Sequence, residues 1–158
     1  MNIEVEKWIL NDSEDVSFHV VKIDKCCDKL LNNEEYIDLT DEIDEGNEYT
    51  SNYKFKLQRD EEEYLGDGIN NTTTYYKSIE YCPYCGKRIN IKVIRTVDIT
   101  DRMKELYKQK DILLKKLNNT DSIKGVRKLR ESISNINNKM DSMYMSDCLE
   151  DIKKKGLI

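Results

Sequence analysis

The pattern of hydrophobic and polar positions changes near residue 99. Before that point, apolar residues fall in short alternating or β-branched runs, at residues 16–23, 36–39, 53–57 and 73–81. Such runs are typical of half-buried strands in an antiparallel sheet. Residues 24–31 instead follow a helical pattern in which Asp24 would be the N-cap. The first part of the chain therefore predicts short strands around one helix.

Two acidic, glycine-containing segments, residues 41–48 and 60–71, separate the predicted strands. Segments of this composition bury little surface, so we expect solvated loops there. Residues 89–94 alternate again between apolar and polar types. We expect them to form the second arm of a β-hairpin whose turn contains Cys82 and Cys85.

After residue 99 the pattern becomes helical, with Thr100 as the expected N-cap. Residues 118–121 interrupt this pattern, and a second apolar repeat follows. Its members are spaced at alternating steps of three and four: Val126, Leu129, Ile133, Ile136, Met140 and Met143. Such a seam, joined to the first helix by a short connection, predicts an antiparallel coiled-coil hairpin.

The second helix is predicted to be longer than the first, so some of its apolar side chains need another surface. Met140, Met143 and Tyr144 would pack on the β unit, on a second copy of the chain, or on another protein. In the interface interpretation, the interaction residues are Val126, Leu129, Ile133, Ile136, Met140, Met143 and Tyr144. The alternative is that all seven form an intramolecular core.

Composition and charge change this picture in two ways. With 38% hydrophobic and 36% charged residues in 158, the chain can bury a modest core, which excludes wholesale disorder. Residues 1–98 hold 12 Lys+Arg against 22 Asp+Glu, a net −10, whereas residues 99–158 hold 14 against 9, a net +5. We therefore predict an α+β fold with two domains, a small antiparallel β domain with one helix and acidic loops at 1–98 and a helical hairpin at 99–158.

The chain has no apolar run near the roughly 20 residues needed to cross a bilayer, and its first residues lack the layout of a signal peptide. We expect a cytoplasmic protein with no membrane partner. Thiols stay reduced in that compartment, so the five cysteines are expected to be ligands or buried thiols.

A Cys-x-x-Cys turn followed by glycine lets two thiolates converge on one metal ion. Cys82 and Cys85 have this spacing in Cys-Pro-Tyr-Cys-Gly. Cys26 and Cys27 are the favoured second pair for a structural tetrathiolate zinc site. If one of that pair is buried instead, His19 is the reserve ligand and the site becomes Cys3His.

Two other uses of the cysteines fit the sequence less well. A redox Cys-x-x-Cys belongs in a βαβ unit and is followed by a helix, and neither is predicted here. Catalytic zinc needs an open coordination position, which four thiolates close. His19 is the single histidine, so no Ser-His-Asp set can be built without it. We therefore expect no enzymatic activity. Cys148 is treated as a lone thiol.

Two stretches carry a resemblance to a known group of proteins. They are Cys-Cys-Asp-Lys-Leu at residues 26–30 and Ile-Glu-Tyr-Cys-Pro-Tyr-Cys-Gly-Lys-Arg-Ile at residues 79–89. Together they resemble small zinc-knuckle (zinc-ribbon-like) proteins common in phages and prophages, over roughly the first 95 residues. The resemblance implies the four-cysteine site, a bacterial host cell, and by analogy a role in disabling a host or defence protein.

Two binding functions remain in competition. The first is a non-enzymatic protein–protein interaction module, with a host or phage protein as partner or a homodimer through the C-terminal helices. The second is a nucleic-acid-binding zinc-ribbon regulator, which the net −10 of residues 1–98 disfavours because a polyanion would be repelled. The basic residues that would meet phosphates are Lys87, Arg88, Lys124, Arg127, Lys128 and Arg130.

Overall fold

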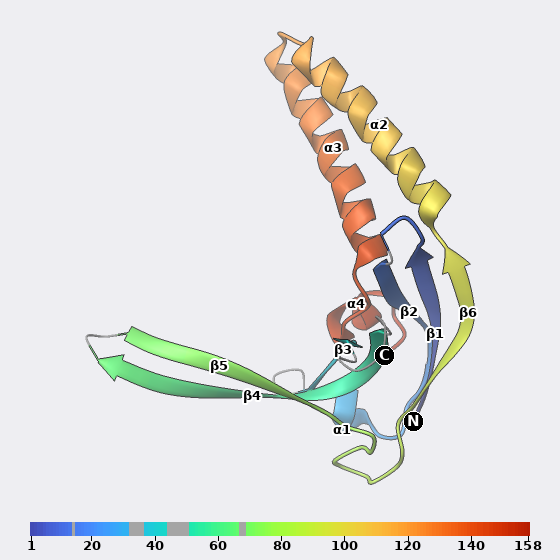
Figure 1. The fold of residues 1–158 in the computed structure, drawn as a ribbon, viewed down its shortest axis with the longest axis vertical. Helices are drawn as coiled ribbons and strands as arrows, with labels where there is room; N and C mark the ends of the chain where they lie inside the picture. Colours follow the sequence, from blue (N-terminus) through green and yellow to red (C-terminus); the bar gives the residue numbers. More distant parts are fainter. Residues whose placement is uncertain (14, 32–36, 44–50, 67–68) are drawn as a thin grey trace. The chain divides into compact units, whose positions relative to one another are not determined.

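The computed structural model describes residues 1–13, 15–31, 37–43, 51–66 and 69–158. Strands and helices both occur, so the fold is α+β as the sequence predicts (Figure 1). The elements in chain order are β1 (Asn2–Leu10), β2 (Asp15–Asp24), α1 (Asp28–Leu31), β3 (Ile37–Ile43), β4 (Ser51–Gly66), β5 (Ile69–Ser78), β6 (Asn90–Asp98), α2 (Thr100–Asn118), α3 (Ile123–Tyr144) and α4 (Leu149–Lys154).

The first sheet has the order β2-β1-β6, with β1 in the middle. Asn90 N donates to Met1 O (2.9 Å) and Ile99 N donates to Ile9 O (3.0 Å), so β6 runs parallel to β1. The predicted hairpin around Cys82 and Cys85 is confirmed only at its base, where Tyr81 pairs with Arg88 in an antiparallel bridge and Ile89 N donates to Glu80 O (2.8 Å). From Asn90 onward the prediction is wrong, because β6 pairs in parallel with the distant β1, and the sheet is not purely antiparallel.

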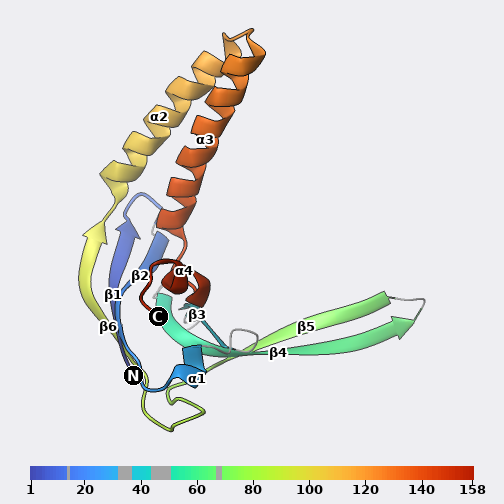
Figure 2. The same ribbon diagram turned by 180° about the vertical axis from the view of Figure 1, so that it is seen from behind.

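The second sheet has the order β3-β4-β5, and both of its pairings are antiparallel. β3 pairs with residues 51–57 of β4, from Ile37 opposite Leu57 to Ile43 opposite Ser51. β4 and β5 continue together to Gly66 opposite Ile69, and both views show them as a long two-stranded ribbon (Figures 1 and 2).

The loop predicted at residues 60–71 is wrong over its described part, because residues 60–66 and 69–71 lie in β4 and β5. The acidic run is opposite polar β-compatible residues of the partner strand, for example Asp60 opposite Thr74 and Glu61 opposite Thr73. Cross-strand pairing overrides the low strand propensity of the acidic residues. In the other predicted loop, residues 41–43 belong to β3 and 44–48 lie outside the described residues.

Two helix starts differ from the prediction. Helix α1 begins at Asp28 and spans four residues, whereas Asp24 is the last residue of β2 and caps no helix. Helix α2 already includes Thr100, whose hydroxyl accepts from Asn11 N (3.1 Å) instead of capping the helix. Asp98 Oδ1 accepts from Thr100 N (2.9 Å). The predicted break between α2 and α3 is confirmed.

The chain divides into two compact units, neither of which is one continuous stretch. Unit 1 comprises Met1–Glu6, Phe18–Arg95 and Asp147–Ile158, and unit 2 comprises Lys7–Ser17 and Thr96–Ser146. Among the described residues, no helix has both the length and the apolar composition needed to span a membrane.

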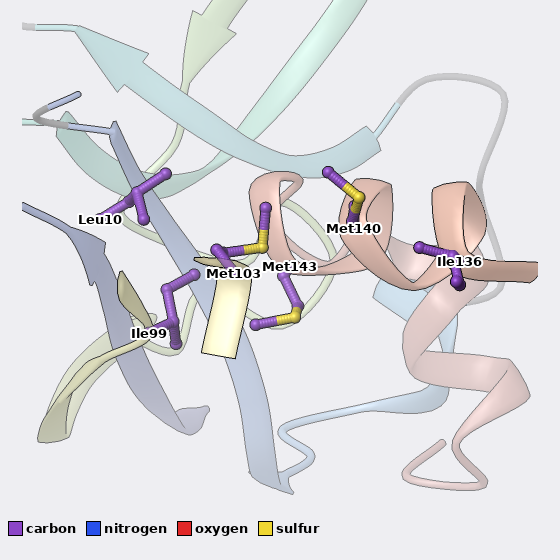
Figure 3. Close-up of a cluster of buried hydrophobic side chains, with 6 residues drawn as sticks. All are labelled: Leu10, Ile99, Met103, Ile136, Met140 and Met143. Carbon is purple, nitrogen blue, oxygen red and sulfur yellow. The ribbon is translucent and has the colours of Figure 1, made fainter. Parts of the chain in front are cut away.

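The core of unit 2 joins its helices to the ends of β1 and β6. Met103 of α2 lies beside Leu10 and Ile99, and α3 contributes its C-terminal half (Figure 3). Trp8 and Leu106 pack around this cluster. The buried members of the cluster are Leu10, Ile99, Met103, Ile136, Met140 and Met143.

The core of unit 1 is built from both sheets and from α4. Phe18 and Tyr53 stack with ring centroids 5.4 Å apart. Phe55 of β4 and Ile152 of α4 are fully buried. Burial of these large apolar side chains, which come from segments far apart in sequence, stabilises the unit.

Candidate metal centre

Four cysteines from two distant segments form one cluster in unit 1. Cys26 and Cys27 lie between the end of β2 and the start of α1, while Cys82 and Cys85 lie in the turn between β5 and β6. Their four Sγ atoms all lie within 4.8 Å of one another. All five cysteines of the chain are free, and Cys27 Sγ is 3.5 Å from Cys82 Sγ, far longer than a disulfide bond.

The position of the cluster follows from the topology. The chain leaves the first sheet after β2 and enters the second at β3, and Cys26 and Cys27 lie on this crossover. It returns from β5 to β6, and Cys82 and Cys85 lie on this second crossover. The cluster therefore ties together the two points at which the chain passes between its sheets.

A tight turn holds the second pair of sulfurs in place. Gly86 N donates to Cys82 O and Cys82 N donates to Lys87 O, each at 2.9 Å, and an antiparallel bridge pairs Tyr81 with Arg88. Gly86 has a φ of 68°, a left-handed conformation that is unfavourable for residues with a Cβ. This explains why glycine follows the second cysteine.

Backbone amides of the turn point at the sulfurs. The N–H of Lys87 donates to Cys85 and lowers the pKa of this thiol from 9.0 to about 7. For Cys82, burial raises the pKa despite amide hydrogen bonds from Tyr84 and Cys85. Burial, followed by the neighbouring thiols of Cys85 and Cys82, raises the pKa of Cys26 to about 12. Without a cation, Cys26 and Cys82 thus resist ionisation whereas Cys85 ionises more readily, and a bound dication would favour the thiolate form at all of its ligands.

The cluster fits a tetrahedral metal ion. Four sulfurs at about 2.3 Å from a central zinc would be separated from one another by roughly 3.8 Å. The separation of 3.5 Å between Cys27 and Cys82, and the limit of 4.8 Å for the whole set, bracket this value. The four cysteines could therefore hold a metal ion, and an all-sulfur tetrahedral set suits zinc or iron.

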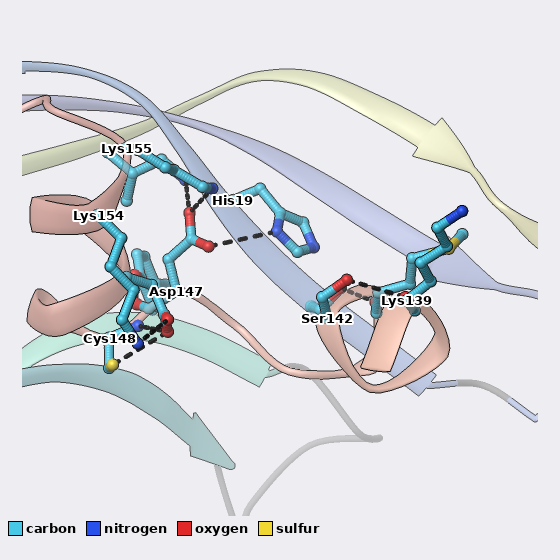
Figure 4. A network of polar contacts seen from close by, with 12 residues as sticks. His19, Lys139, Ser142, Asp147, Cys148, Lys154 and Lys155 are labelled. Atoms are coloured by element: carbon cyan, nitrogen blue, oxygen red, sulfur yellow. Dashed lines mark hydrogen bonds and ion pairs between the residues drawn. The ribbon is translucent and has the colours of Figure 1, made fainter. Parts of the chain in front are cut away.

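His19, the predicted reserve ligand, is outside the cluster. It is buried on β2, and its Nδ1 lies 3.6 Å from Asp147 Oδ1 (Figure 4). Asp147 Oδ2 also accepts from Val20 N (2.6 Å) and from Lys155 Nζ (2.5 Å). Asp147 was not singled out in the sequence, and no local pattern around it could have revealed that it anchors the C-terminal segment of unit 1.

Cys148 is separate from the four-cysteine cluster. It precedes α4, and its Sγ donates to Asp151 Oδ2 (3.0 Å) while its backbone N donates to the same oxygen (3.3 Å). Burial and the Asp151 carboxylate raise the pKa of this thiol. These contacts fix the start of α4.

The residues of the predicted interface fall into two groups. Toward the C-terminal end of α3, Ile136, Met140 and Met143 are buried in the core of unit 2, and Tyr144 packs against them with its hydroxyl 3.2 Å from that of Tyr107. Toward the N-terminal end, Val126, Leu129 and Ile133 are half-buried. The surplus apolar side chains of α3 thus pack on β1 and β6 residues of the same chain.

The turn of residues 81–88, which carries Cys82 and Cys85, exposes two tyrosines and two cations. Tyr81 and Tyr84 are 57% and 43% exposed, and Lys87 and Arg88 are exposed on the same turn.

Comparison with known protein families, characterised proteins and solved structures finds no significant match to this chain.

Proposed function

We propose that this chain is a non-enzymatic protein–protein interaction module stabilised by a structural zinc ion. The observation that carries the proposal is the four-cysteine cluster, whose sulfurs come from two crossovers 55 residues apart. Cys26, Cys27, Cys82 and Cys85 would hold the zinc. When bound, the ion supplies no reaction chemistry and acts as a cross-link, because four thiolates fill its tetrahedral shell.

The surroundings of the cluster support a structural role. Within the described residues, the cluster of possible metal-ligating side chains contains four cysteines and no histidine or carboxylate. A zinc-activated water requires an open coordination position, and a general base close to it. The buried histidine, His19, is instead paired with Asp147.

The hydrogen bonds and charges of the turn support a closed tetrathiolate metal site, for which we propose zinc. The N–H groups of Tyr84, Cys85 and Lys87 all donate to cysteine sulfurs of this turn. Such hydrogen bonds stabilise thiolates around a closed structural ion. Lys87 and Arg88 follow Gly86 at the end of the turn and would offset part of the net negative charge of a zinc tetrathiolate.

A role in binding another protein is supported by the surface of unit 1. Several large apolar side chains are exposed on its strands, although single exposed residues are common in any protein. Val21 lies on β2, Tyr75 on β5, and Val93 and Ile94 on β6, each more than 40% exposed. The resemblance to phage zinc-knuckle proteins makes a host or defence protein the proposed partner, with inhibition as the outcome.

Nucleic-acid binding is the second candidate, and one observation favours it. Tyr81 and Tyr84 are exposed together with Lys87 and Arg88 on one turn, and exposed aromatics beside cations are typical of single-strand binding surfaces. The net charge of −10 over residues 1–98 opposes it. Binding to a single-stranded oligonucleotide that weakens steeply with salt would favour this candidate over the first.

The zinc site is tested by elemental analysis of the purified chain. The wild type is expected to contain one zinc per chain, and the double variant Cys82→Ser, Cys85→Ser none. Cys148→Ser is the matched control, because it also removes a thiol but leaves the cluster intact, and it should keep its zinc. Iron in the wild type, or zinc retained by the double variant, would contradict the assignment.

The interaction role is tested by affinity capture from a bacterial lysate, with and without nuclease. A partner protein retained in fixed stoichiometry after nuclease, and lost with the Cys82→Ser, Cys85→Ser variant, is the expected result. Recovery of nucleic acid with its associated proteins, all lost after nuclease, would overturn the proposal in favour of the second candidate.

A further inference from the structure

The closed end of the α2–α3 hairpin carries an open groove in unit 2. The groove has a volume of about 490 Å³. Its apolar part comes from one side chain of each helix, Ile112 and Leu129, and its lining also includes two lysines. The lining residues are Ile112, Lys115, Lys116, Asn119, Thr120 and Leu129.

The end of the groove is held by side-chain hydrogen bonds to the last turn of α2. Asn119 Nδ2 donates to Lys115 O (3.0 Å), and Thr120 Oγ1 donates to Lys116 O (2.6 Å). These bonds satisfy carbonyls that the helix terminus would leave unpaired. The backbone that carries both lysines is therefore fixed before a ligand arrives, which lowers the ordering cost of binding.

This end of the hairpin is strongly basic and carries exposed apolar groups. Residues 108–130 hold 8 Lys+Arg against 2 Asp, a net +6. Ile112, one of the residues that line the groove, is 52% exposed, and Ile123, at the start of α3, is 89% exposed. A partner that covers this surface must therefore supply negative charge and apolar side chains together.

We infer that the groove binds an acidic amphipathic peptide segment of another protein, with an apolar side chain on Ile112 and Leu129 and carboxylates at Lys115 and Lys116. The inference rests on the proposed function, since it names the partner chemistry of an interaction module. An apolar anchor in a pocket with charged residues at its rim is the usual anatomy of such an interface.

Two other anionic partners fit less well. Nucleic acid would use the lysines but has no aliphatic group for Ile112, and the groove lining has no aromatic side chain on which bases could stack. A flat anionic bilayer would meet the exposed Ile123 and the lysines, but not a concave site between two helices. The lining therefore favours a peptide side chain.

The test measures fluorescence anisotropy with the full-length, zinc-loaded chain. The probe is a labelled peptide of roughly four helical turns with Leu at every third or fourth position and Glu elsewhere. Peptides with Lys in place of Glu, or Ser in place of Leu, are the probe controls. A single-stranded oligonucleotide and phosphatidylserine vesicles represent the other anionic partners.

The wild type is expected to bind the acidic amphipathic peptide and neither control peptide. Lys115→Glu with Lys116→Glu should weaken binding at least about tenfold, and Ile112→Ser should also weaken it. Lys92→Glu with Lys139→Glu is the matched control, since it changes the net charge equally on exposed residues outside the groove and should leave binding unchanged.

Tighter binding to the oligonucleotide or the vesicles than to the peptide would overturn the inference. So would peptide binding that the Lys115, Lys116 variant does not weaken. Capture from lysate with this variant separates the two proposals. A partner protein still retained by it refutes the groove as the binding surface, while the interaction role itself stands.

Discussion

Asp147 provides the sharpest quantitative test of the structure. Its carboxylate is buried in unit 1, where it accepts from Val20 N (2.6 Å) and Lys155 Nζ (2.5 Å) and faces His19 Nδ1 at 3.6 Å (Figure 4). Its backbone is also held, because Asp147 N donates to Phe18 O (2.9 Å). These contacts join the segment that carries α4 to β2, so replacing the side chain should destabilise unit 1.

The expected cost can be built from the contacts. Asp147→Ala leaves the buried N–H of Val20 without its acceptor, which costs about 1–3 kcal/mol. Loss of the ion pair with Lys155 adds about 1 kcal/mol or less, because that lysine is 41% exposed and solvent screens it. We expect Asp147→Ala to lower the free energy of unfolding by about 3 kcal/mol. Asp147→Asn keeps an acceptor for Val20 and should cost about 1 kcal/mol.

The pH dependence has a definite sign. Burial alone would raise the pKa of Asp147, but hydrogen bonds from His19, Lys155 and Val20 together lower it below 3.8. A carboxylate with a lowered pKa stabilises the folded state above its unfolded pKa of about 3.9, and this stability is lost as pH falls through the folded value. The difference in unfolding free energy between wild type and Asp147→Asn should therefore be largest at neutral pH and shrink below about pH 4.

Urea denaturation followed by circular dichroism measures both effects. All variants are compared at the same pH, so that any loss of metal in acid affects each chain alike. Asp111→Ala, a change to an exposed acidic residue of α2, is the control and should shift stability by no more than about 0.5 kcal/mol. Wild-type stability of Asp147→Ala at neutral pH would contradict this role of the carboxylate. So would a difference in unfolding free energy between wild type and Asp147→Asn that stays constant as the pH falls.

Three further predictions concern the metal, the core and the turn. Chelation, or Cys82→Ser with Cys85→Ser, should remove hydrogen-exchange protection from β3, β4 and β5, because structural zinc contributes about 10 kcal/mol to folding. Cys148→Ser should leave this protection unchanged, and full protection after chelation would contradict the prediction. Met140→Ala should lower stability by about 2–5 kcal/mol through a cavity in the core of unit 2, and an unchanged urea midpoint would refute that packing. Gly86→Ala should lower the free energy of unfolding by about 1 kcal/mol through the φ of 68° alone, since a Cβ at this position meets no atom within 4 Å. An unchanged midpoint in thermal melts would show that the turn can relax.

Local patterns predicted the two long helices, α2 and α3, and several strands, whereas α4 was not predicted. The break at residues 118–121 and the apolar repeat of α3 follow from helical periodicity, which needs no knowledge of distant residues. The pair Cys82 and Cys85 was also recognisable, because Cys-x-x-Cys followed by glycine encodes its own turn. The structure brings this pair and the favoured second pair, Cys26 and Cys27, into one cluster.

Elements that depend on distant partners were harder to predict. β1 was missed, although Ile3 and Val5 alternate with charged residues and are fully buried. The acidic part of β4 looked like a loop because its strand conformation depends on pairing with β5. His19 looked like a ligand because its actual partner, Asp147, lies 128 positions away and has no sequence signature.

The topology explains why a metal would be useful at this place in the chain. The segment that forms the second sheet begins near Cys27 and ends near Cys82, 55 residues later. Closing a loop of that length costs roughly 4 kcal/mol of chain entropy. A zinc ion that binds only the closed form offsets this cost with its own binding free energy, of about 10 kcal/mol or more. Metal loss should therefore mainly destabilise the segment between Cys27 and Cys82. The helices α2 and α3, whose core contains none of the four cysteines, should keep their protection when the metal is removed.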